Sequence, residues 1–249
     1  MRGAYNMIEY ASITSKGSRE VNEDRIGITV LDDNTICFAV ADGLGGHGRG
    51  DLAAELAIKT ADDVFRAFYN RKDILKLIFE SAQKRVLFER KELGERFSLK
   101  TTLSAAVFRG NKFSFGTIGD SRILVFRNGS LAERSHDHSL AQLLCDAGDI
   151  LPEEVRTHPD RNRLLRCIGD EWGQNSYELS ESETVCDVNT AVLICTDGFW
   201  SLISEADITG YLKESGSARE WLSKMETVVS SAAEAIQSDN YSAITVMIK

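Results

Sequence analysis

The chain has 249 residues, of which 43% are hydrophobic and 27% are charged, values typical of one globular domain over residues 1–249. Its formal net charge of -9, without a long run of Lys or Arg, disfavours nucleic acid as a partner. No apolar stretch is long enough for a membrane span or a signal peptide, so we predict a cytoplasmic protein with no membrane contact.

Short apolar runs rich in β-branched and aromatic residues predict strands along most of the chain. In chain order the predicted strands are Ile36–Ala41, Leu103–Phe108, Lys112–Ile118, Arg122–Phe126, Ala191–Thr196 and Ala243–Ile248. Turn sequences at 109–111 and 127–129, each containing Gly and Asn, favour antiparallel hairpins between neighbouring strands.

Apolar residues at helical spacing predict two long helices after the first strand, at Asp51–Tyr69 and Asp73–Leu93. A shorter helix is predicted at Asp137–Ala147, and a capping-box pattern at Ser217–Glu220 opens a last helix. The segment 148–182 is polar and irregular. Because strands and helices occur in blocks instead of alternating, the pattern favours an α+β fold with antiparallel sheets.

Cysteine and histidine do not indicate a zinc site. The five cysteines have no C-x-x-C spacing, which disfavours a disulfide framework and predicts reduced, mostly buried thiols. His136, His138 and His158 form no helical pair of ligands, and we expect them to be structural.

Acidic residues recur at the ends of the strand-like runs. Asp42-Gly43 and Asp197-Gly198 each follow a buried-type strand, and Asp120 joins two strands. The full set is Glu23, Asp24, Asp42, Asp120, Asp197 and Asp239. Converging carboxylates repel one another unless a cation neutralises them or their pKa values rise. Oxygen ligands with few histidines favour magnesium or manganese, so we predict a site for one of these ions.

Two alternatives compete with a metal site. Asp-Gly is a hairpin signal, but neither Asp-Gly pair is flanked by two strands. The stretch 43–48 matches G-x-G-x-x-G between a strand and a helix, and Asp62 follows about 20 residues later, as in dinucleotide-binding proteins. However, Asp42 would repel a pyrophosphate, and two successive helices replace the expected return to a strand.

A series of motifs resembles, in the same order, those of the metal-dependent serine/threonine protein phosphatases, the type 2C family, in its compact bacterial form. The motifs are Arg19–Asp24, Asp42–His47, Thr101-Thr102, Gly119–Arg122, Asp137–Leu140, His158–Asn162, Thr196–Gly198 and Asp239-Asn240. The match runs through essentially the whole chain. The resemblance implies two antiparallel β-sheets packed as a central sandwich, flanked by helices on both sides in a four-layer αββα arrangement.

The resemblance also implies a metal site with two core Mn²⁺ or Mg²⁺ ions and a weaker third. Asp42 would bridge the two core ions, with the Gly43 carbonyl, Asp197 and Asp239 completing the shell. Glu23 matches the acidic ligand of the animal enzymes, where bacterial members more often have Gln. Asp24 matches a ligand or water-holding residue beside it, and Asp120 matches the carrier of the third ion.

Catalytic roles follow from the same resemblance. A hydroxide bridging the two ions would attack phosphoserine or phosphothreonine in proteins, opposing a serine/threonine kinase, and the usual form is a monomer. Arg19 matches the phosphate-binding arginine, whose planar fork suits two phosphate oxygens. His47 is the nearest candidate general acid, with metal-bound water or no dedicated acid as alternatives. The segment 148–182 matches the family's flap, which could gate protein substrates.

Two rival functions stay open at this point. A catalytically silent, metal-free binding module of the same fold should lack a core carboxylate, but none is missing here. Another metal-dependent phosphohydrolase, such as a nuclease, should show a basic substrate face, which the acidic net charge disfavours.

Overall fold

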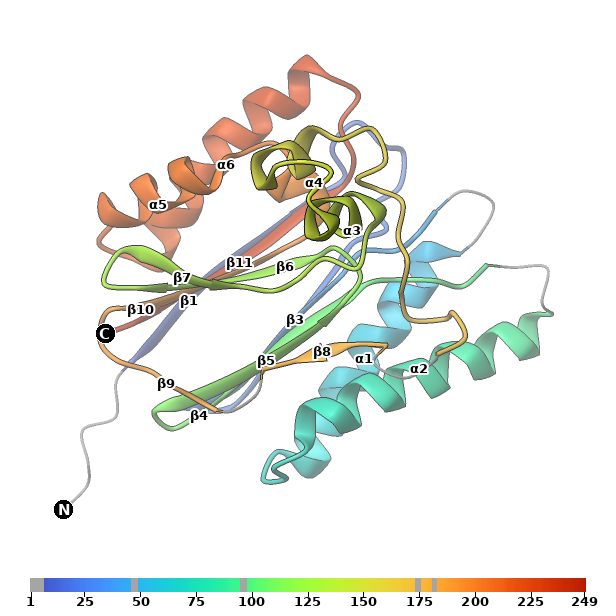
Figure 1. The fold of residues 1–249 in the computed structure, drawn as a ribbon. Coiled ribbons are helices and arrows are strands. Elements are labelled where there is room, and N and C mark those ends of the chain that lie inside the picture. The colour runs from blue at the N-terminus through green and yellow to red at the C-terminus, as the bar shows by residue number, and fades with distance from the viewer. Residues whose placement is uncertain (1–6, 46–48, 95–97, 173–175, 181–182) are drawn as a thin grey trace.

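The computed structural model describes residues 7–45, 49–94, 98–172, 176–180 and 183–249. These residues form two antiparallel β-sheets that pack face to face, with helices on both outer faces (Figure 1). This is the four-layer α+β sandwich that the resemblance implies. None of the helices within those ranges is both long and apolar enough to cross a membrane.

The first sheet contains β1 (Ile8–Ser15), β6 (Arg122–Arg127), β7 (Ser130–Arg134), β10 (Thr190–Cys195) and β11 (Tyr241–Ile248). Its strand order is β1-β11-β10-β6-β7. The second sheet contains β2 (Arg25–Asp32), β3 (Thr35–Ala41), β4 (Leu103–Arg109), β5 (Lys112–Ile118), β8 (Glu178–Leu179) and β9 (Thr184–Val185). Its order is β2-β3-β4-β5-β8, and β9 also pairs with β5. All neighbouring strands are antiparallel.

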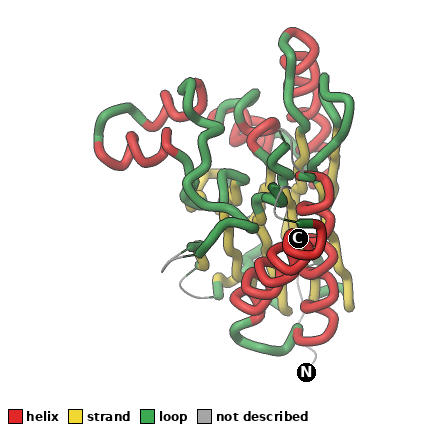
Figure 2. The backbone as a smooth tube through the Cα atoms, turned by 90° about the vertical axis from the view of Figure 1, so that its right-hand side faces the viewer, coloured by secondary structure: helices red, strands yellow, loops and turns green. Residues whose placement is uncertain are grey.

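Helices cover the outer face of each sheet, and they surround the strands in the view turned by 90° (Figure 2). The second sheet packs against α1 (Gly50–Phe68) and α2 (Ile74–Leu93). The first sheet packs against α4 (Asp197–Trp200), α5 (Glu205–Lys213) and α6 (Ala218–Ala235). The shorter α3 (Leu140–Ala147) and a 3₁₀ helix (Pro152–Thr157) follow β7.

The central strand β3 shows how the layers are held together. Phe38 and Val40 point into the layer between the two sheets, whereas Cys37 and Ala39 pack against the helices on the outer face. All four are almost completely buried, because a strand in the middle of the sandwich has protein on both faces. The continuous apolar run in the sequence reflects this double burial.

Two local sequence signals are confirmed in detail. Asn128 and Gly129 both have positive φ angles, 50° and 71°, as the type I′ turn that joins β6 to β7 requires. Ser217 caps α6 by accepting a hydrogen bond from the backbone N–H of Glu220 at 3.1 Å. The second half of the predicted capping box differs, because the Glu220 carboxylate accepts from the N–H of Gly216.

One predicted boundary is wrong, and five strands, β1, β2, β7, β8 and β9, are not among those predicted. The helix expected from Asp137 begins at Leu140, because Ser139 caps it, while Asp137 lies before the helix and accepts hydrogen bonds from Arg122. The strand β1 pairs with β11 along its whole length, but only two of its residues, Ile8 and Ala11, are buried. An edge strand with so few buried positions has a weak apolar signature.

Candidate active site

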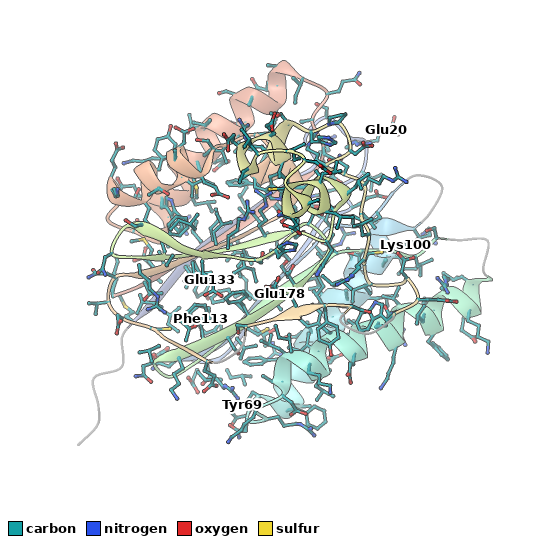
Figure 3. The ribbon with its side chains drawn as sticks, viewed as in Figure 1. Glu20, Tyr69, Lys100, Phe113, Glu133 and Glu178 are labelled. Atoms are coloured by element: carbon teal, nitrogen blue, oxygen red, sulfur yellow. The ribbon has the colours of Figure 1, made fainter. Side chains whose placement is uncertain are left out.

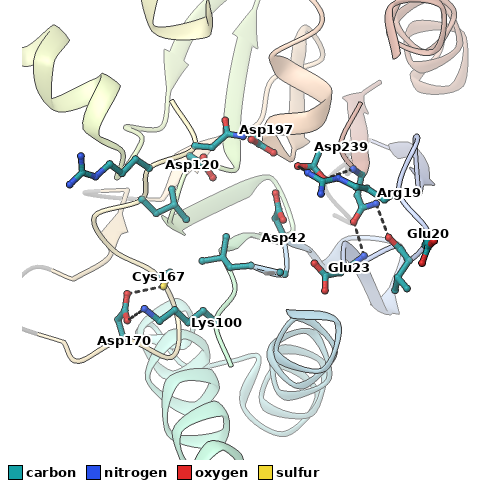
Figure 4. Close-up of a pocket in the computed structure, with 18 residues that line it drawn as sticks. Arg19, Glu20, Glu23, Asp42, Lys100, Asp120, Cys167, Asp170, Asp197 and Asp239 are labelled. Carbon is teal, nitrogen blue, oxygen red and sulfur yellow. Dashed lines mark hydrogen bonds and ion pairs between the residues drawn. The ribbon is translucent and has the colours of Figure 1, made fainter. Parts of the chain in front are cut away.

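One end of the sandwich holds a cavity of about 660 Å³ (Figure 4). Figure 3 shows two of its lining residues, Glu20 and Lys100, at the same end of the molecule. The predicted site residues that line it are Arg19, Glu23, Asp42, Gly43, Asp120, Asp197 and Asp239. Asp24 is not on the cavity surface, and His47 lies outside the described residues.

The fold brings acidic residues from both sheets to this end. Asp42 follows β3 of the second sheet, and Asp197 follows β10 of the first sheet as the first residue of α4. Asp120 lies in the short connection through which the chain crosses from β5 to β6, and therefore from one sheet to the other. The three carboxylates are far apart in the sequence but meet because these strand ends lie together.

The backbone at the end of β3 is held firmly. The N–H of Asp42 donates to the Thr102 hydroxyl at 2.9 Å, and its carbonyl accepts from the Thr101 hydroxyl at 2.8 Å and from the Thr102 N–H at 2.9 Å. Gly43 packs directly against the backbone of Gly50, where any β-carbon would collide. The Asp42 carboxylate and the Gly43 carbonyl are therefore presented from a rigid base.

The carboxylates of Asp42 and Asp197 line the same cavity, and their charges repel one another. Burial, followed by repulsion from Asp24, Asp197 and Asp120, holds the pKa of Asp42 well above its usual range. Burial also raises the pKa of Asp197. This pair is a site of unbalanced negative charge that a cation would relieve.

Asp120 is held by side chains that pack below the cavity. Its side chain is buried, and burial together with the charges of Asp197 and Asp137 keeps its pKa well above the usual range. Its backbone carbonyl accepts a hydrogen bond from the Trp200 indole at 2.9 Å. The guanidinium of Arg122 lies over the same indole, with its central carbon 3.5 Å from the ring centroid.

Asp24 lies behind the cavity wall. Its Oδ2 accepts from the Thr196 hydroxyl at 2.9 Å, but its Oδ1 has no hydrogen-bond partner among the described residues. Burial raises the pKa of Asp24 to about 7. Burying an acceptor without a partner costs folding free energy unless a cation or a water molecule contacts it.

At the rim of the cavity, the segment 16–23 contacts residues 239–240, which precede the last strand. Arg19 donates to Asp239 Oδ2 at 2.9 Å. The Asn240 amide accepts from the backbone N–H of Glu23 at 2.8 Å and donates to two carbonyls in the 16–21 loop. Burial, then the carboxylates of Asp51 and Asp239, raise the pKa of Glu23. The sequence motif contained Asn240, but its role as a clamp was not predicted.

The opposite wall contains residues that sequence reasoning missed. Lys100 and Asp170 form an ion pair at 2.5 Å, and the Cys167 thiol donates to Asp170 at 3.0 Å. Asn162 and Arg163 line the same cavity. Asn162 belongs to the motif at 158–162, but no role was assigned to it. The signal for the others was weak, since they only adjoin or lie near the motifs at 101–102 and 158–162.

The donor set fits a hard divalent ion. The acidic half of the site, made of Glu23, Asp42, Asp120, Asp197 and Asp239, offers only oxygen atoms as ligands. The unpartnered Oδ1 of Asp24 and the raised pKa of Asp42 both indicate that positive charge is missing here. Among the described residues, no three Asp, Glu, His or Cys side chains are yet arranged closely enough to hold an ion. One of the predicted ligands, Asp239, is instead paired with Arg19.

The structure excludes both alternatives for the Asp-Gly pairs. β3 lies between the antiparallel neighbours β2 and β4, so the parallel βαβ unit of a dinucleotide site is not formed. Neither Asp-Gly pair is a hairpin turn, because β3 leads toward α1 and β10 leads into α4.

The fold and the carboxylate-lined cavity define an enzyme of the metal-dependent protein phosphatase class. The model of one protein family, described as protein phosphatase 2C, matches residues 15–233. The chain therefore belongs to the protein phosphatase 2C family, as its sequence motifs indicated.

Relatives and solved structures agree with this assignment. The serine/threonine phosphatase stp of Listeria welshimeri is 31% identical over 209 residues, which are 81% of each chain. The serine/threonine phosphatase PstP/Ppp of Mycobacterium tuberculosis has a crystal structure with a TM-score of 0.82 and 26% identity, covering 98% of this chain and 99% of that one. The catalytic domain of PstP in complex with two manganese ions shares the fold, with a TM-score of 0.80 at 24% identity over 98% of this chain and 99% of that one.

Proposed function

We propose that this chain hydrolyses phosphate esters of serine and threonine side chains in proteins, using Mn²⁺ or Mg²⁺ ions. The observation that carries the proposal is the convergence of Asp42, Asp120 and Asp197 from both sheets in one cavity, with pKa values raised by burial. The names of the relatives, serine/threonine phosphatases, and the two-manganese complex of PstP support it.

We assign the residues of the acidic half to the ions as the family resemblance suggests. The proposed ligands are Asp42, the Gly43 carbonyl, Asp197, Asp239 and Glu23 for the two core ions, and Asp120 for a weaker third. Bound ions would supply positive charge opposite the substrate phosphate and lower the pKa of the attacking water. The place of Asp24 behind the wall suits a role in holding water or neighbouring ligands.

Arg19 is well placed to bind the phosphate. Its side chain is 60% exposed at the rim, where it already contacts one anion, Asp239. Turning the guanidinium from this carboxylate to a substrate phosphate would require only a change of partner at the same rim. The planar fork could then hold two phosphate oxygens and orient the ester.

Proton donation and substrate gating are further parts of the proposal. His47 stays the candidate proton donor for the leaving alkoxide, with water or no dedicated acid as alternatives. The flap assignment of 148–182 is supported by five of its residues that line the cavity, Asn162, Arg163, Leu164, Cys167 and Asp170. The flap would thus form one wall of the substrate site.

The cellular setting belongs to the proposal as well. All five cysteines are free thiols, which fits a reducing compartment such as the cytoplasm. We propose that the chain acts there as a monomer on phosphoproteins made by a serine/threonine kinase.

The test is hydrolysis of a phosphothreonine peptide with manganese, with and without a chelator. Asp42→Asn should lower kcat/KM by about a hundredfold or more, because it removes a negative charge that the ions require. Asp33→Asn, in the exposed turn between β2 and β3, is the matched control and should behave as the unaltered chain. Activity that survives chelation, or Asp42→Asn at full rate, would overturn the proposal.

A further inference from the structure

The cavity has basic residues on opposite sides of its acidic base. Arg19 lies on one side of Asp42 and Lys100 on the other (Figure 4). A volume of about 660 Å³ is within the range of pockets that enclose drug-sized ligands, so there is room beside a single phosphate group. A substrate phosphate held by Arg19 and by the ions proposed at Asp42 therefore leaves the wall with Lys100 available to another part of the substrate.

Lys100 is anchored to the same strand end that carries Asp42. The N–H of Leu44 donates to the Lys100 carbonyl at 2.9 Å, and Thr102, two residues further on, donates to the carbonyl of Asp42 at 2.9 Å. Lys100 can therefore not drift away from the reaction centre without disturbing the backbone of Asp42. Its side chain is 35% exposed and faces the cavity.

Asp170, the ion-pair partner of Lys100, is also held in place by hydrogen bonds to its backbone and that of its neighbour. The backbone carbonyl of Asp170 accepts from the Gln83 amide of α2, and the same amide group accepts from the N–H of Gly169 at 2.7 Å. Arg90 donates to the carbonyl of Gly169 at 2.7 Å. The Asp170 carboxylate, in contact with the Lys100 ammonium at 2.5 Å, is thus held on the cavity wall by α2.

The Lys100 ammonium has capacity for a second anion. It has three N–H donors, and Asp170 is its ion-pair partner among the described residues. The hydrogen bond with Asp170 raises the pKa of Lys100, so the group is charged at neutral pH. Arg163 lines the same cavity, is exposed, and has no ion pair with another described residue. Together these groups leave an excess of positive charge on this wall.

We propose that Lys100, assisted by Arg163, selects substrates in which an anionic side chain flanks the phosphoserine or phosphothreonine. The anion is either the carboxylate of Asp or Glu or a second phosphorylated residue. Asp170 already pairs with the Lys100 ammonium, so it competes with the substrate anion for this group. The inference rests on the proposed function and adds the substrate class to it.

The test compares kcat/KM for phosphothreonine peptides that carry Ala, Lys, Glu or phosphoserine at each of the four positions on either side. The discrimination ratio is the value for an anionic flank divided by that for Ala. We expect a ratio of about threefold to tenfold at one or two positions, which is typical of a half-exposed, charge-assisted contact. A larger ratio for phosphoserine than for Glu would identify doubly phosphorylated sites as the preferred source.

The variants make the assignment specific. Lys100→Met should bring the ratio to within about twofold of one, through KM, and Lys100→Glu should favour the Lys peptides. Asp170→Asn, which keeps the shape of the wall, should raise the ratio about twofold to threefold because the competitor is gone. Lys84→Met, on the exposed face of α2, is the matched control and should keep the full ratio. Circular dichroism confirms that each variant is folded.

Two failures can be told apart. If the unaltered chain hydrolyses every peptide at the same rate, or if Lys100→Met and Asp170→Asn both keep the full ratio, the inference is wrong and the proposed function stands. If the unaltered chain hydrolyses no phosphothreonine peptide with manganese, the proposed function itself fails, and the inference with it.

Discussion

The ion pair between Arg122 and Asp137 is the most consequential buried interaction near the site. The two side chains are 5% and 1% exposed, and three N–H···O contacts of 2.6 to 3.1 Å join them. The next carboxylate, Glu205, is 3.9 Å from the guanidinium and 39% exposed. Asp137→Ala would therefore leave a buried charge with only one weak substitute partner.

Breaking such a pair from one side costs about 3–5 kcal/mol, and the residual contact with Glu205 places our expectation near the lower end, about 3 kcal/mol. For a domain of this size that is a fall in Tm of roughly 6–12 °C. The double variant Arg122→Met/Asp137→Ala removes both charges, and we expect it to be at least about 1 kcal/mol more stable than Asp137→Ala alone.

Urea unfolding followed by circular dichroism measures both values, and phosphatase activity on the folded fraction reports the second effect. Because Arg122 stacks on Trp200, which in turn holds the carbonyl of Asp120, activity should fall more than the folded fraction does. A cost below about 1 kcal/mol for Asp137→Ala, or a double variant less stable than the single one, would show that the pairing described here is not the one that stabilises the site.

Two further outcomes are expected. Gly43→Ala should cost about 2–3 kcal/mol in urea unfolding and reduce activity, because its β-carbon would collide with the backbone of Gly50, whereas Gly210→Ala, with open space in α5, should be neutral or slightly stabilising. An equal cost for both would contradict this reading. His138 accepts a hydrogen bond from the Gly119 N–H at 3.1 Å, and burial lowers its pKa to about 4. The unfolded chain then takes up a proton first as pH falls below about 6.5, so this group should lower the stability by about 1.5 kcal/mol between pH 6.5 and 5. His138→Asn should flatten that slope in pH-dependent unfolding. An unchanged slope would contradict the assignment.

Much of the fold could be predicted from local patterns. The strands β3, β4, β5 and β10 are buried on both faces or nearly so, and their continuous apolar runs were legible without a structure. The turn at Asn128-Gly129 and the cap at Ser217 depend on the conformational preferences of one or two residues, so they were equally legible. The edge strand β1 and the start of α3 were not, because neighbours distant in sequence decide them.

The sequence by itself determined which residues we propose to carry the chemistry, since a carboxylate at a strand end and an ordered series of motifs are properties of the chain alone. Only the tertiary structure decided how these groups meet. It placed Asp42 and Asp197 in one cavity, paired Arg19 with Asp239, put Asp24 behind the cavity wall, and set Lys100 across the cavity. The physical reason is that charge interactions depend on distance and burial, and the distance between two sheets is set by packing that no local pattern records.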